Sequence, residues 1–68
     1  MKPASIKVGD EFIKTEVPNT VWVVTQLVDL QGLPPHAELR VKGHFSRMML
    51  MSLEALIDHR LFHRIEDS

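Results

Sequence analysis

A chain of 68 residues has room for one small domain and no more, because this length is near the lower limit for burying a self-sufficient core. Apolar residues make up 44% and charged residues 25%, the proportions of a globular protein and not of a disordered or fibrous one. The formal net charge of −1 argues against wholesale electrostatic attraction to nucleic acid or anionic lipid. We therefore expect a single domain over residues 1–68, with flexible ends at 1–7 and 66–68.

The chain contains no cysteine, no apolar stretch of signal-peptide length near its start and no run of about 20 apolar residues. Disulfides therefore cannot brace the fold, and we expect a soluble, cytoplasmic protein without a membrane partner. Chains this short usually need support beyond one hydrophobic core, from a metal, a cross-link or a second subunit. Without cysteine, association with another chain is the expected support.

The first half of the chain predicts two strands. Val8-Gly9-Asp10 is a turn signal, since glycine tolerates a positive φ and aspartate bonds to nearby backbone, and a strand is expected over residues 11–17. Pro18-Asn19 predicts the next reversal. Residues 20–30 are rich in β-branched residues and apolar on both faces. Such a strand either bends to serve two packed layers or has its outer face covered by a partner.

Two further strands are expected after the loop at residues 31–35, which is marked by a glycine and paired prolines. Residues 36–42 alternate between apolar and charged side chains, as in an antiparallel strand with one solvated face. Residues 43–46 predict a reversal, and the apolar run 47–51 predicts a short buried strand.

Residues 58–65 decide between two fold classes. Ser52 is a good helix N-cap, because its hydroxyl can accept hydrogen bonds from the free amides of a first turn. In one interpretation the helix is a single turn over 52–57, and residues 61–65 form a fifth strand. In the other, an apolar stripe continues the helix to Ile65, which gives an α+β fold with a four-stranded sheet and a C-terminal helix. We favour the fifth strand, because it pairs back and protects a sheet edge.

This order of elements resembles the small SH3-like barrel, which implies a mostly β fold of about five antiparallel strands with one short helical turn. Val21-Trp22, Pro34-Pro35-His36 and the stretch 52–56 also resemble segments of short bacterial proteins of unassigned function. SH3-like barrels bind peptides, nucleic acid or other subunits, so the resemblance selects no single ligand. Three phenylalanines, one tryptophan and no tyrosine are too few for the aromatic row that holds proline-rich peptides.

No catalytic constellation is recognisable, and we expect neither an enzyme nor a cofactor. The serines lack a nucleophile elbow, and the three glycines form no phosphate loop. Among the four histidines, His59 and His63 have a spacing that could chelate zinc on a helix. Arg60 and Arg64 flank them and would repel a metal, so we interpret both as surface residues. The other two histidines lie in predicted turns and receive no role.

We expect the protein to be a binding or assembly module that acts through protein–protein contacts. It would form a homodimer or bind another protein. Met49 and Met51 are its predicted interface together with Trp22, because methionine is common on surfaces that repack against a partner. Strand alternation places these two methionines on the face opposite to Met48 and Leu50, and one of the two pairs must meet a second layer.

A basic hairpin makes single-stranded nucleic acid the alternative ligand. Cations there would contact phosphate while an aromatic ring stacks on a base, as in other small barrels. Glu38 lies on the same strand face and weakens this hypothesis. The predicted contact residues are Arg40, Lys42, Phe45 and Arg47.

Overall fold

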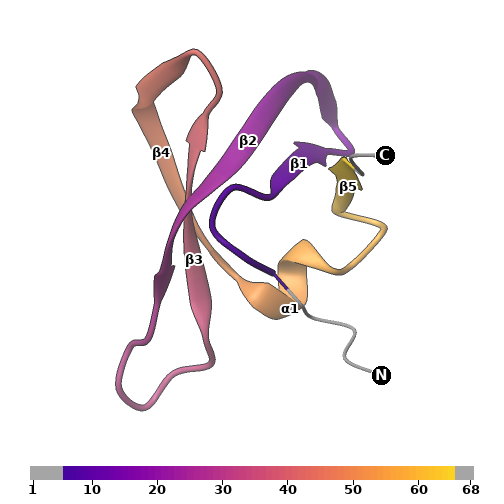
Figure 1. The fold of residues 1–68 in the computed structure, drawn as a ribbon. Helices are drawn as coiled ribbons and strands as arrows, with labels where there is room; N and C mark the ends of the chain where they lie inside the picture. The colour runs from indigo at the N-terminus through magenta and orange to yellow at the C-terminus, as the bar shows by residue number, and fades with distance from the viewer. Residues whose placement is uncertain (1–5, 66–68) are drawn as a thin grey trace.

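The computed structural model describes residues 6–65, which form a five-stranded antiparallel sheet with one short helical turn (Figure 1). The mostly β prediction is confirmed, with the fifth strand and without the C-terminal helix. The spatial order β4-β3-β2-β1-β5 leaves β4 and β5 at opposite edges, so the sheet is open and forms no closed barrel. The elements are β1 (Glu11–Lys14), β2 (Val17–Val28), β3 (His36–Val41), β4 (His44–Ser52), α1 (Leu53–Leu56) and β5 (Phe62–Ile65).

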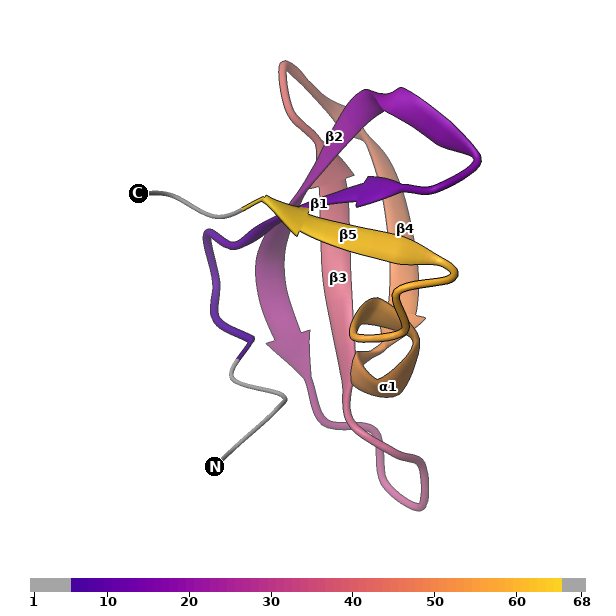
Figure 2. The same ribbon diagram turned by 90° about the vertical axis from the view of Figure 1, so that its right-hand side faces the viewer.

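The long strand β2 belongs to both halves of the sheet. Its middle residues pair with β1 on one side and with β3 on the other. A bulge between Val24 and Gln26 interrupts the β2–β3 ladder, and bulges increase the bend and twist of a strand. β1 and β5 consequently cross in front of β3 and β4 at a steep angle (Figure 2). One apolar face of β2 enters the core through Trp22 and Val24, whereas Val21 and Val23 on the other face are half-buried.

The core fills the space between the crossing halves, and α1 closes it below β5 (Figure 2). Phe12 and Phe62 meet there edge to face, with ring centroids 6.4 Å apart. Leu56, from α1, is as deeply buried as Phe12. The buried residues are Ile6, Phe12, Trp22, Val24, Ala37, Leu39, Val41, Leu56 and Phe62.

The helix ends after one turn because backbone and side-chain groups of Asp58 start a loop. The Ser52 hydroxyl caps the helix by accepting a hydrogen bond from the Ala55 amide at 3.2 Å, as predicted. The Asp58 carboxylate then accepts a hydrogen bond from the Arg60 amide at 2.9 Å. The backbone carbonyl oxygen of Asp58 accepts one from the Phe62 amide at 3.0 Å. The apolar stripe is thereby divided between a helical turn and a strand.

The chain reverses at other residues than predicted at two places, the one predicted at Pro18-Asn19 and the one predicted at residues 43–46. β1 ends at Lys14, which pairs with Val17, whereas Ile13 pairs with Val21. Pro18-Asn19 therefore sits in a bulge of β2 and not in the turn, which suits a proline because it has no amide hydrogen to give to a ladder. β4 begins earlier than predicted, because Gly43 has a φ of +86° and completes the reversal at once.

The predicted flexible ends are only partly within the described residues. Ile6, which belongs to the expected flexible end, is buried in the core. Residues 1–5 and 66–68 lie outside the described range.

The helical turn α1 has four residues, and no helix within 6–65 has the length or apolar content to span a membrane.

Candidate functional site

β4 divides its apolar side chains between the core and the solvent. Met49 lies opposite the fully buried Leu39, and both Met49 and Met51 pack against the core. Met48 and Leu50 point the other way and are 53% and 47% exposed. The free apolar surface of this strand is therefore the face opposite to the predicted one.

Trp22 is a core residue and offers no contact surface. Only 6% of it is exposed, and two cations from different strands lie over its ring. The Lys14 ammonium is 5.6 Å from the ring centroid and the Arg47 guanidinium is 6.0 Å from it. The Trp22 indole nitrogen is buried and has no hydrogen-bond partner among residues 6–65. The predicted interface of Trp22, Met49 and Met51 is thus corrected, because all three face inward.

A wide bulge interrupts β4 beside the tip of its hairpin. Val41 pairs with His44, but the preceding residue of β3, Arg40, pairs with Met48, so residues 45–47 have no partners in the ladder. Such bulges re-aim the side chains that they carry. This one leaves Phe45 55% exposed.

Arg40 holds this bulge in place. Its guanidinium donates to the Phe45 carbonyl oxygen at 2.7 Å and to the Met48 sulfur at 3.4 Å. Its Nε donates to the Glu38 carboxylate at 3.1 Å. Because these donors serve the protein itself, Arg40 has a structural role in β4.

The four predicted nucleic-acid contacts do not form one patch. Arg40 lies on the outer face of the sheet, whereas the exposed Arg47 lies over the ring of Trp22. Lys42 forms an ion pair with Glu11 at 3.0 Å. Lys42, Phe45 and Arg47 are all exposed, but Phe45 is the one of the four whose side chain contacts no charged or aromatic partner within the described chain.

Replacement of Arg40 by alanine is expected to lower the free energy of unfolding by about 1–2 kcal/mol, because a hydrogen bond from a charged donor to a carbonyl is lost. Urea unfolding followed by circular dichroism measures this. Arg60→Ala is the control, since the Arg60–Asp58 pair is exposed and such pairs contribute little to stability. Equal losses in both variants would contradict the role of Arg40.

The carboxylates with shifted pKa values are all held in the charged form. Burial alone would raise the pKa of Asp10, but hydrogen bonds from the Lys7 amide and the Arg64 guanidinium outweigh it and lower the pKa. The Thr25 hydroxyl at 2.7 Å, followed by Arg40, lowers the pKa of Glu38. Arg60 lowers the pKa of Asp58 to about 2. None of these carboxyls is tuned toward neutral pH, where a general acid or base works.

The histidines do not gather into a metal site. His59 lies in the loop after α1 and His63 in β5, so they share no helix face. His36 Nδ1 lies 2.6 Å from the Pro34 carbonyl oxygen. In the described part of the chain, no three histidine or acidic side chains are grouped closely enough to hold a metal ion.

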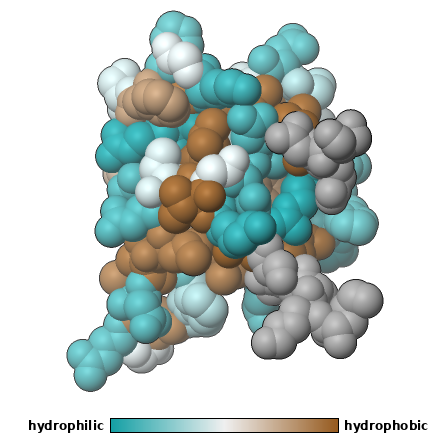
Figure 3. Space-filling view, in the orientation of Figure 1, coloured by the Kyte–Doolittle hydropathy of each residue, from teal (hydrophilic) through white to brown (hydrophobic). Residues whose placement is uncertain are grey.

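A further apolar area lies away from β4. Figure 3 shows apolar side chains gathered over β2 and the lower end of the β2–β3 hairpin, with polar side chains around them. Leu27 of β2 and Leu33 of the following loop are 47% and 57% exposed. Exposed apolar residues are therefore present on two sides of this small molecule.

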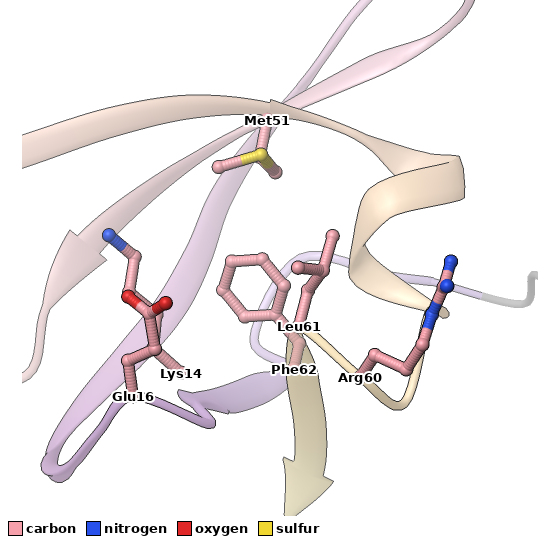
Figure 4. Close-up of a pocket in the computed structure, with 6 residues that line it drawn as sticks. All are labelled: Lys14, Glu16, Met51, Arg60, Leu61 and Phe62. Atoms are coloured by element: carbon pink, nitrogen blue, oxygen red, sulfur yellow. The ribbon is translucent and has the colours of Figure 1, made fainter.

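A small pocket opens between the two free edges of the sheet. Its volume is about 180 Å³, and Met51 points from β4 toward Leu61 and Phe62 across it (Figure 4). Lys14, Glu16 and Arg60 line the same pocket with charged groups. The pocket has both charge signs and a narrow apolar centre, so it favours no ligand class.

Comparisons with protein-family models, with curated proteins and with solved structures found no match to this chain. Its function is therefore inferred from the described residues themselves. The two features that point to binding are the exposed edge strand β4 and a cleft lined by Lys42, His44 and Arg47.

Proposed function

We propose that this chain is a non-catalytic assembly module that binds protein through the free edge and outer face of β4. One observation carries the proposal. β4 is an edge strand, and its regular part, Met48 to Ser52, has no charged residue and exposes Met48 and Leu50. Proteins that stay monomeric usually block such an edge with charges, prolines or a covering segment.

A second copy of the chain is the partner that fits this edge best. Two β4 strands can pair antiparallel about a two-fold axis and continue the sheet from one copy into the other. With Leu50 at the axis, Met48 of each copy lies opposite Ser52 of the other. No charged residue meets another in this register, and the exposed apolar side chains of both copies form one continuous ridge.

The proposal extends to fold and compartment. The strand order, the bent β2 and the single helical turn before β5 support an SH3-like arrangement that remains open between β4 and β5. Folds of this kind present surfaces to other chains and select no particular ligand. The proposed compartment is the cytoplasm, since the fold needs no disulfide and hence no oxidising environment to form.

Sedimentation velocity at rising protein concentration tests the assembly. The native chain is expected to form a dimer, and Leu50→Glu is expected to weaken it at least about tenfold, because two like charges would meet at the axis. Leu33→Glu is the matched control, since Leu33 is at least as exposed as Leu50 but lies in the loop before β3. A native chain that remains monomeric up to millimolar concentration would contradict the proposal.

A further inference from the structure

Two bulges create a cleft of about 280 Å³ beside the hairpin tips. One bulge is in β2 at residues 18–20, and the other is in β4 at residues 45–47. The backbone between them is held by the Lys42 amide, which donates to the Val21 carbonyl oxygen at 2.9 Å. Two valines and five polar or basic residues line the cleft, the latter being Asn19, Thr20, Lys42, His44 and Arg47.

The lining of this cleft offers hydrogen-bond donors and contains no aspartate or glutamate. Within residues 6–65, the side chains of Asn19, Thr20 and His44 make no hydrogen bond. Among the residues that the structure describes, the Arg47 guanidinium interacts with the face of Trp22 and forms no hydrogen bond or ion pair, so its N–H groups can turn toward a ligand.

Lys42 is the second cation of the cleft. Its ion pair with Glu11 is exposed at the lysine end, where the side chain is 60% accessible. Exposed pairs of this kind are weak, and the lysine can exchange its carboxylate partner for another anion. Glu11 itself does not line the cleft.

We propose that this cleft binds a phosphate group, carried by a small phosphate ester or by single-stranded nucleic acid. Residues carrying a guanidinium, an ammonium, an amide and a hydroxyl line the same cleft, and the two cations are the donors from which phosphate oxygens accept most strongly. A water molecule occupies about 30 Å³, so the cleft has room for a phosphate and part of its substituent.

Trp22 is the built-in reporter of this site. It is the sole tryptophan of the chain, and Arg47 lies over its ring at 6.0 Å. A phosphate that draws the guanidinium away from the indole changes the environment of the ring. Titration with inorganic phosphate at constant ionic strength is therefore expected to change the fluorescence of Trp22 and to shift the amide resonances of Lys42 and His44. Sodium chloride at the same ionic strength is expected to leave both unchanged.

Variants locate the binding. Arg47→Gln and Lys42→Gln are each expected to weaken phosphate binding about tenfold, as loss of one charge-assisted contact does. Lys42→Gln retains the stacked arginine, so it serves if Arg47→Gln disturbs the fold. Arg60→Gln is the matched control, because Arg60 does not line this cleft. Leu50→Glu is expected to bind phosphate normally, which separates this site from the proposed assembly edge.

The phosphate source is decided by comparing inorganic phosphate with a short oligothymidine. Nucleic acid is the source if the oligomer binds at least about tenfold more tightly and loses affinity steeply as salt rises. A small ester is the source if the oligomer binds no more tightly than inorganic phosphate. No response of Trp22, Lys42 or His44 to phosphate, or an equal response to chloride, would overturn the proposal.

Discussion

Replacement of Phe12 by alanine is expected to unfold a large fraction of the protein. Phe12 is 1% exposed and packs edge to face against Phe62, while the Arg64 guanidinium lies 5.6 Å from its ring centroid. Removal of a buried phenylalanine ring costs about 3–5 kcal/mol. The whole free energy of unfolding of a chain this long is about 3–10 kcal/mol. One substitution therefore removes a large part of the total stability.

Circular dichroism and the dispersion of amide resonances measure this loss. Where Phe12→Ala remains partly folded, its urea midpoint is expected to lie far below that of the native chain. Phe45→Ala is the matched control, because Phe45 is 55% exposed and such surface changes usually cost less than about 0.5 kcal/mol. Similar midpoints for the two variants would show that Phe12 does not sit in the core.

The strand content was predictable where the polarity alternates. The alternation over residues 36–42 predicts one buried apolar face, and its apolar residues Ala37, Leu39 and Val41 are all buried. Alternation identifies these positions because a strand with one solvated face must separate its apolar and polar side chains. The Ser52 cap was readable for a similar reason, since a hydroxyl at a helix start has a defined role.

The reversals were harder to predict, because bulges depend on pairing and not on composition. Pro18-Asn19 looks like a turn in sequence, yet the ladder of β1 continues past it. The bulge at residues 45–47 has no local signature, because Arg40 stabilises it from the neighbouring strand. The cleft between these two bulges was therefore not foreseeable, although Lys42 and Arg47 had been singled out for their charge.

The orientation of β4 could not be predicted either. Both of its faces are rich in apolar residues, so the pattern does not say which face meets the core. The register decides it, because Leu39 and Ala37 bring Met49 and Met51 inward with them. A one-residue shift of the register would have exposed Met49 and Met51 and turned Met48 and Leu50 inward.

A charge placed on each face of β4 in turn is expected to give opposite results. Met49→Glu directs a carboxylate toward the fully buried Leu39, and an unpaired charge in such surroundings is expected to cost about 3 kcal/mol or more. Met48→Glu places the same group on a side chain that is 53% exposed, where the cost is expected to stay within about 0.5 kcal/mol.

Urea unfolding of the two variants, at a concentration where the native chain is monomeric, measures the difference. Met48→Glu is expected to unfold at nearly the native midpoint and, in the sedimentation experiment, to lose assembly as Leu50→Glu does. Met49→Glu is expected to unfold at a much lower midpoint, because Met49 packs against the core and a carboxylate placed there loses water without gaining a partner. If Met49→Glu retained the native midpoint while Met48→Glu unfolded, the register of β4 would be the reverse of the one described, and the assembly surface would consist of Met49 and Met51.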